Sequence, residues 1–185
     1  MNAKLTAMLC TNKRIEAIYE VDTESGGFAT VVCRSDGQEE LYPHCKIETV
    51  LDVLAACKGK TLPRLRLLRG KERGNYRQHI DYYTIDLGLI LMPVRQRRAV
   101  NTGHGVMAYL NVARILGASE SSGGGAELTF LSGKKLHVLE SAAKVRSKID
   151  RGKKLLYDDY HACEEELHYM RITMRRMQHM LEAGL

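Results

Sequence analysis

The sequence lacks several features that mark particular classes of protein. Its 185 residues include no tryptophan, two phenylalanines and three prolines. So few large aromatics argue mildly against a platform that stacks single-stranded nucleic acid, although an RNA-binding role stays open. No apolar run approaches the roughly 20 residues that a membrane span needs, and Met1 to Cys10 has no secretory signal pattern. We therefore expect a cytoplasmic protein with no membrane partner.

Motifs for catalysis, metals and cofactors are also missing or incomplete. The stretch Gly103–Ala108 fits G-x-G-x-x-A, but eight residues separate it from the preceding apolar run, so it does not form a dinucleotide loop. The histidines are scattered and no C-x-x-C pair exists, which argues against a zinc site. The five cysteines are expected to be reduced thiols: Cys10, Cys33, Cys45, Cys57 and Cys163. We predict no catalytic residues, no metal and no cofactor, and hence no enzyme.

The positive charge of the chain is concentrated in two zones. The net charge is +6, yet residues 61–116 carry ten basic and three acidic side chains, and nine of those ten are arginine. Residues 134–154 carry eight basic and two acidic side chains, whereas residues 155–185 carry three and six. Two basic zones predict a polyanion-binding surface that forms in the folded protein. The arginine bias favours bidentate contacts with phosphates and base edges.

Hydrophobic periodicity predicts an α+β protein with a β-rich antiparallel body, a short packed helix and a long C-terminal helix. A three-stranded meander is expected over Arg14–Val21, Phe28–Cys33 and Glu39–Tyr42, followed by a helix over Lys46–Cys57. Leucine and arginine alternate in Thr61–Arg73, which predicts a strand with its arginines outward. Later, Gly117–Gly125 is expected to be a loop, and Ala126–Phe130 with Lys135–Leu139 a hairpin.

The central stretch, Leu87–Leu116, contains two apolar runs that predict core strands, Leu87–Val94 and Val106–Leu116. The segment between them carries three arginines and two glycines, so it is expected to be an exposed basic loop. Its candidate contact residues are Arg95, Arg97, Arg98, Asn101 and His104. A solvated connection with no ligand is the alternative interpretation.

The last segment predicts a helix with a heptad seam. A helix is expected to begin at Ser141, with Gly152 as its interruption or end. Apolar residues then recur at spacings of four and three: Leu156, Tyr160, Cys163, Leu167, Met170, Met174, Met177 and Leu181. Such a seam either packs on its own domain or pairs with a partner helix, most simply from a second copy. We divide the chain into a DNA-binding domain, residues 1–153, and a self-association helix, residues 154–185.

The order of these features resembles the ComK family of bacterial competence transcription factors over roughly residues 14–155. The resemblance rests on Val50-Leu51-Asp52, Gly59, Tyr83-Thr84-Ile85-Asp86, Met92-Pro93 and the hairpin Phe130–Lys135 before Ser141. The chain departs from the family after the basic loop, where Met107-Ala108-Tyr109 replaces a cysteine and a tryptophan. Membership implies an activator that binds A/T-rich promoter DNA through the minor groove as several subunits, under the control of a protease adaptor.

We accordingly predict a sequence-specific, DNA-binding transcription regulator that forms a homodimer or higher oligomer. Arg95, Arg97 and Arg98 would contact the groove or the phosphates, with Asn101 and His104 beside them. Lys134 and Lys135, expected to be exposed in a hairpin turn, would bind a second phosphate, and Arg64, Arg66 and Arg69 would add charge. Two alternatives stay open: a LytTR-like output domain that uses the major groove, and a non-nucleic-acid interaction protein that acts through its C-terminal coiled coil.

Overall fold

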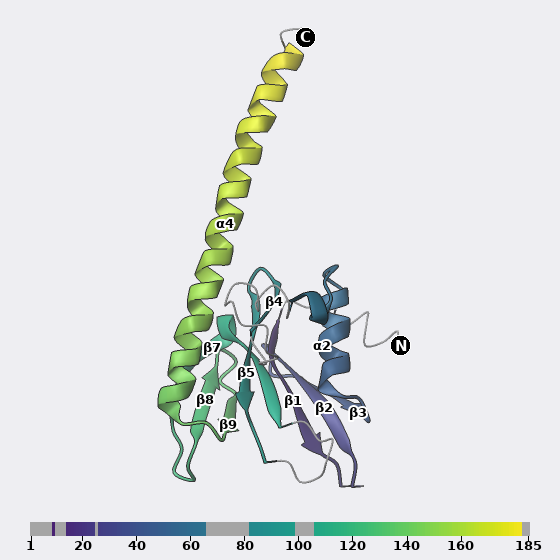
Figure 1. The fold of residues 1–185 in the computed structure, drawn as a ribbon, viewed down its shortest axis with the longest axis vertical. Helices are drawn as coiled ribbons and strands as arrows, with labels where there is room; N and C mark the ends of the chain where they lie inside the picture. Colours follow the sequence, from purple (N-terminus) through teal and green to yellow (C-terminus); the bar gives the residue numbers. More distant parts are fainter. Residues whose placement is uncertain (1–8, 10–13, 25, 66–81, 99–105, 183–185) are drawn as a thin grey trace.

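The protein consists of a β-rich body from which one long helix projects (Figure 1). The computed structural model describes residues 9, 14–24, 26–65, 82–98 and 106–182. The strands are β1 (Ile15–Asp22), β2 (Phe28–Arg34), β3 (Glu39–Pro43), β4 (Tyr83–Asp86), β5 (Leu89–Arg95), β6 (Met107–Asn111), β7 (Ile115–Glu120), β8 (Ala126–Phe130) and β9 (Lys135–Val138). The helices are α2 (Ile47–Ala56) and α4 (Ala142–Glu182), and η1 (Val112–Arg114) is a 3-10 turn. This architecture confirms the predicted α+β class.

Six strands form one antiparallel sheet in the order β3-β2-β1-β6-β5-β4. Both faces of this sheet are covered, and successive side chains of a strand point to opposite faces. In β5, Ile90 and Met92 therefore join one core cluster while Leu89 and Leu91 join the other. This is why β5 is apolar at nearly every position.

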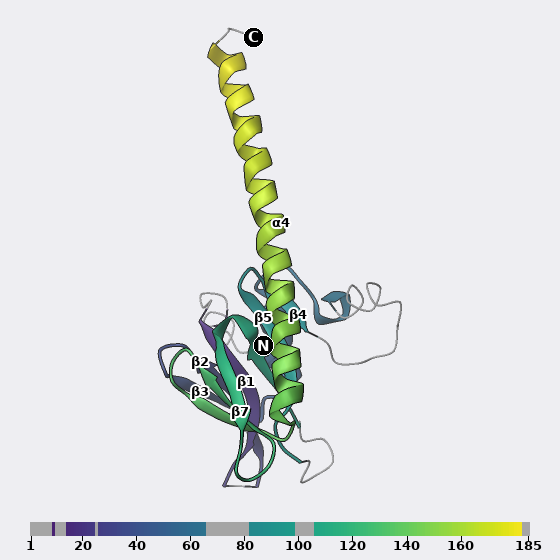
Figure 2. The same ribbon diagram turned by 90° about the vertical axis from the view of Figure 1, so that its left-hand side faces the viewer.

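Different elements cover the two faces of the six-stranded sheet. Helix α2 lies on one face, where its buried Leu51 and Leu54 belong to the same core cluster as Ile18 and Tyr109. On the other face lie the three-stranded sheet, in the order β7-β8-β9, and the first part of α4. Both views of the ribbon show the rest of α4 rising well beyond the body (Figures 1 and 2). Among the described residues, no helix is both long enough and apolar enough to cross a membrane.

Several predicted elements are confirmed. The N-terminal meander is β1, β2 and β3, the short helix is α2, and the late hairpin is β8 and β9. The two central apolar runs contain β5 and β6, which pair with each other. These elements were predictable because each has a clear period of its own and a turn at its boundary.

The prediction of a single strand over Val106–Leu116 is wrong. The chain leaves the first sheet after Asn111, which is fully buried. The Nδ2 amide of Asn111 donates to the carbonyl oxygens of Ile15 (2.9 Å) and Gly88 (3.3 Å), and its Oδ1 accepts from the backbone N–H of Ala113 (3.1 Å). These bonds cap η1 and turn the chain into β7. Because β7 continues to Glu120, the predicted loop Gly117–Gly125 is also too long.

The prediction of a strand over Thr61–Arg73 is wrong where the structure describes it. Residues 62–65 are helical, with Leu62 and Leu65 buried and Arg64 exposed. Two buried leucines three residues apart lie on one face of a helical turn, whereas in a strand they would point to opposite faces. Residues 66–73 lie outside the described part of the chain.

Gly152 neither interrupts nor ends the C-terminal helix, so that prediction is wrong as well. Helix α4 is continuous from Ala142 to Glu182, and Gly152 is buried within it. A Cβ atom added there would lie 2.5 Å from Cγ2 of Val112 and 3.1 Å from Cε1 of Tyr82. Gly152 is therefore a position of close contact between α4 and the body, and the helix crosses the predicted domain boundary without a break.

The expectation that all five cysteines are reduced is wrong for Cys57, which is disulfide-bonded. Cys33, Cys45 and Cys163 are free thiols. Burial raises the pKa of the Cys45 thiol.

Candidate nucleic-acid interface

The two basic zones of the sequence meet where β5 ends and α4 begins. The backbone N–H of Arg95, the last residue of β5, donates to Oε1 of Glu140 at 2.7 Å. The backbone N–H of Leu139 donates to the carbonyl oxygen of Arg95 at 2.8 Å. These bonds join the end of β5 to the segment that leads from β9 into α4.

Glu140 is the acidic centre of this junction. Its side chain is only 7% exposed, and Lys148 Nζ donates to its Oε1 at 2.8 Å while Lys144 Nζ lies 3.4 Å from its Oε2. Lys148 also donates to the carbonyl oxygen of Pro93 at 2.8 Å. Burial by itself would raise the pKa of Glu140, but the hydrogen bonds from Lys148 and Arg95 and the charges of both lysines lower it below its usual value. Glu140 is thus an anion that holds the side chains of Lys144 and Lys148, from the second basic zone, and the backbone of Arg95, from the first.

We give the name β5-end patch to four basic residues of this region: Arg95 and Arg98, at and just beyond the end of β5, and Lys144 and Lys148, in the first turns of α4. Arg95 and Arg98 are exposed, and the Lys144 side chain is 65% exposed, whereas Lys148 is largely held by its two partners. Basic side chains continue along the exposed face of the same part of α4: Arg146, Arg151, Lys153 and Lys154. The patch can bind phosphates through Arg95, Arg98 and Lys144.

Arg97 has a different position from its two neighbours. Its guanidinium group lies 2.5 Å from Oδ2 of Asp22, at the end of β1, and its side chain is only 17% exposed. The backbone N–H groups of Gln96 and Arg97 both donate to the carbonyl oxygen of Val106, at 2.9 and 3.4 Å. Arg97 therefore attaches the base of the basic loop to the β1–β2 hairpin, and its side chain is a positioning group.

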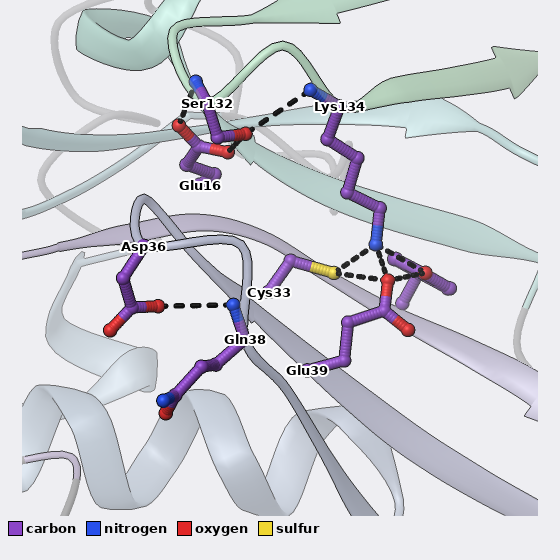
Figure 3. A network of polar contacts seen from close by, with 8 residues as sticks. Glu16, Cys33, Asp36, Gln38, Glu39, Ser132 and Lys134 are labelled. Atoms are coloured by element: carbon purple, nitrogen blue, oxygen red, sulfur yellow. Dashed lines mark hydrogen bonds and ion pairs between the residues drawn. The ribbon is translucent and has the colours of Figure 1, made fainter.

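Lys134 is not exposed as predicted, because its amino group points between the two sheets (Figure 3). It forms an ion pair with Glu39 and donates to Sγ of Cys33 at 2.9 Å and to the hydroxyl of Tyr19 at 3.2 Å. Burial raises the pKa of the Tyr19 hydroxyl.

The neighbouring Ser132 also faces the six-stranded sheet, since Glu16 accepts from its backbone N–H at 3.1 Å and from its hydroxyl at 2.5 Å (Figure 3). The turn between β8 and β9, in the three-stranded sheet, is therefore hydrogen-bonded to β1 of the six-stranded sheet.

The remaining predicted DNA contacts are spread over the molecule. Lys135 is 62% exposed but lies 2.7 Å from Oε1 of Glu127, on the three-stranded sheet. Arg64 is exposed and follows Lys60 by four residues. Lys60 donates to the carbonyl oxygen of Thr84, which pairs with Ile90 near the beginning of β5. Arg64 therefore lies away from the β5-end patch. The other predicted contacts lie outside the described residues: Arg66, Arg69, Asn101 and His104.

The predicted heptad seam lies on α4 and is mostly exposed. Leu156 packs partly against the body, and the hydroxyl of Tyr160 lies close to Gly88 in the β4–β5 turn. Beyond Cys163 the seam residues are exposed: Leu167, Met170, Met174, Met177 and Leu181.

Sequence reasoning missed Glu140, Lys144 and Lys148. The excess of basic residues over 134–154 identified the zone, but its contacts were assigned to the turn lysines because a hairpin turn is usually exposed. The relevant signal was the spacing of Glu140, Lys144 and Lys148, which allows i, i+4 and i, i+8 contacts when a helix begins at residue 141 or 142.

No group of three or more potential metal ligands occurs within the described residues. No family model matches the chain, and neither the curated proteins nor the solved structures contain a match.

Proposed function

We propose that the chain is a DNA-binding transcription regulator that acts in the cytoplasm and contacts duplex DNA with the β5-end patch. The observation that carries this proposal is the junction at Glu140. One carboxylate there holds the backbone of Arg95, from the arginine-rich zone, and the side chains of Lys144 and Lys148, from the second zone. A surface that joins two basic zones remote in sequence has the charge distribution of a phosphate-binding site.

The fixed backbone at Arg95 also favours DNA binding over the alternative in which the basic residues are solvated and bind no ligand. The backbone of Arg95 is held by Glu140 and Leu139, so the exposed side chain of Arg95 leaves the end of a fixed strand, and Arg98 follows three residues later. Arginine side chains that project from a fixed edge can enter a narrow A/T-rich minor groove, where the negative potential is strongest. The resemblance to the ComK family adds two further parts to the proposal: activation of competence promoters and control by a protease adaptor. Both rest on that resemblance alone.

The proposal can be tested by fluorescence-anisotropy titrations of A/T-rich and G/C-rich duplexes over a salt series. The variant Arg95→Ala/Arg98→Ala/Lys144→Ala removes the exposed cations and leaves the backbone bonds of Arg95 intact. We expect A/T-selective binding by the wild type. We expect the slope of log affinity against log salt to be smaller in the variant by about 0.9 for each phosphate that the variant no longer neutralises.

A matched control removes three charges elsewhere: Arg64→Ala/Lys135→Ala/Arg175→Ala. We expect this control to keep the wild-type salt slope, because its residues lie away from the β5-end patch. Equal reductions of affinity in both triple variants would assign binding to net charge alone. If no duplex bound at low salt, the DNA-binding proposal would be overturned.

The choice of groove separates this proposal from a LytTR-like domain. A ligand that occupies the A/T minor groove should displace the protein, whereas protection of guanine N7 from methylation would indicate major-groove contacts. A non-nucleic-acid interaction protein is the second candidate function, and the exposed apolar seam of α4 favours it.

A further inference from the structure

The projecting half of α4, residues 157–182, carries an apolar stripe that is exposed along most of its length. Beyond Cys163, its seam residues range from 44% exposed at Leu167 to 77% at Leu181. The mean α-helix is about three turns long, and a single helix surrounded by water has no partner for such a stripe. A helix that extends this far from its body therefore has a surface suited to a partner helix.

The stripe lies on the same side of α4 as the body. Each buried residue of α4, and the partly buried Leu156, lies 18 residues, and hence five full helical turns, before a seam residue. The pairs are Ala142 and Tyr160, Val145 and Cys163, Ile149 and Leu167, Gly152 and Met170, and Leu156 and Met174. The seam is therefore the direct continuation of the docking face.

We propose that a second copy of this chain covers the seam, and that the two α4 helices pair antiparallel. The proposal stands apart from DNA binding, since a chain that binds no DNA can still pair in this way.

The position of the body excludes a parallel pair over the seam. In a parallel pair the same residues of both helices lie at the same height, and the seams face each other. Each body lies on the seam side of its own helix, so both bodies would occupy the same space beside Val145 and Ile149. An antiparallel pair places the bodies at opposite ends of the helices and avoids this overlap.

The charges of the projecting half favour the same orientation. Its first part is acidic, with Glu164, Glu165 and Glu166, and its last part is basic, with Arg171, Arg175 and Arg176. A parallel pair would place acidic segments side by side. An antiparallel pair places each acidic segment beside the basic segment of the partner, which lowers the electrostatic energy of the pair.

The seam also sets the register. When the two-fold axis lies at the level between His168 and Tyr169, Leu167 faces Met170 of the partner subunit. Cys163 then faces Met174 of the partner subunit, and Tyr160 faces Met177 of the partner subunit. Each contact occurs twice, as a two-fold axis requires, and Glu164 lies near Arg171 of the partner subunit. Leu181 reaches the level of Leu156, where the body of the partner limits further overlap.

The association itself is tested by sedimentation velocity of the full chain over the micromolar range. We expect a dimer for the wild type and a monomer for Leu167→Lys/Met174→Lys, which changes only seam residues that are exposed in the single chain. The matched control Tyr169→Lys/Ile172→Lys adds the same charge outside the seam and should remain dimeric. A wild-type monomer throughout the range, or a monomer in the control alone, would overturn the proposal.

The orientation is tested by oxidative cross-linking through Cys163, the single cysteine of α4. In the antiparallel pair the two copies of Cys163 lie 11 residues apart along the axis, about 16 Å, which is too far for a disulfide. We therefore expect no Cys163 cross-link in the wild type and a covalent dimer in Met174→Cys. Cys163→Ser/Met174→Cys should abolish that link. A disulfide between two copies of Cys163 in the wild type would indicate a parallel pair and overturn the proposal.

Discussion

The two halves of α4 form one continuous helix with one apolar face, yet only one half is buried. In the docked half, residues 142–156, the buried residues of this face are small or β-branched, namely Ala142, Val145, Ile149 and Gly152, and all contact the body. In the projecting half, the equivalent positions carry larger and more flexible residues such as Met170 and Met174, and they are exposed. The same helical period therefore identifies the apolar face of both halves without revealing which surface covers it.

Side-chain size explains the difference between the halves. Small residues allow the helix to approach a sheet closely, and Gly152 has almost no space for a methyl group. Methionine is flexible and fills irregular gaps, which suits a contact that forms only when two chains meet. The docked half is thus matched to one rigid surface, and the projecting half is suited to an adaptable one.

The largest expected effect comes from truncation of equivalent positions in the two halves. Ile149→Ala removes a buried side chain and should lower the free energy of unfolding by about 2–5 kcal/mol. Leu167→Ala, five turns further along the same face, should change it by no more than about 0.5 kcal/mol in the dilute monomer. Urea denaturation at low protein concentration measures both values. Similar destabilisation at both positions would mean that the projecting half is packed within the single chain.

A smaller effect is expected at Gly152, where α4 packs closely on the body. Gly152→Ala should lower the free energy of unfolding by about 1–3 kcal/mol, because the new Cβ would lie 2.5 Å from Cγ2 of Val112. On an exposed helix the same substitution would stabilise by about 1 kcal/mol. In a Val112→Ala background the additional destabilisation caused by Gly152→Ala should shrink. If Gly152→Ala were stabilising, the close packing of Gly152 would be refuted.

An effect of similar size concerns charge and depends on pH. Glu140→Gln should lower the free energy of unfolding by about 1–3 kcal/mol at neutral pH, because Lys148 and Lys144 lose their anion. The interactions of Glu140 lower its pKa in the folded protein, so its contribution is present above the unfolded value of about 4.3 and is lost as the pH falls through the lower folded value. The difference between wild type and variant should therefore shrink in acid.

Glu165→Gln is the matched control in the projecting half. Glu165 lies 3.5 Å from His161 on an exposed surface, and such pairs contribute about 0.2–1 kcal/mol at most. We expect little change in stability for this variant. A difference between wild type and Glu140→Gln that persisted unchanged at acid pH would contradict the assignment of Glu140 as the anion of the junction.

The sequence by itself determined the elements whose pattern is local. Alternation predicted β1, a run of β-branched residues predicted β2, and the turn at Asp36-Gly37 predicted β3. The 3.6-residue period predicted α2, and the heptad spacing predicted the apolar face of α4. These predictions hold because the period of a strand or helix decides which of its side chains share a face, whatever the partner. The predictions from local pattern failed at Asn111 and at Leu62 and Leu65, where buried contacts with other segments outweighed that pattern.

Only the tertiary structure decided which charges are exposed and what the helix touches. Lys134 faces inward because Glu39, Cys33 and Tyr19 lie opposite it, and Lys144 and Lys148 join Arg95 because Glu140 lies between them. A glycine stands at position 152, within α4, because Val112 and Tyr82 fill the space that a side chain would need. Each outcome depends on residues far away in the chain. The contribution of a charged side chain or a glycine to the stability of the folded protein is set by the atoms that the fold brings into contact with it.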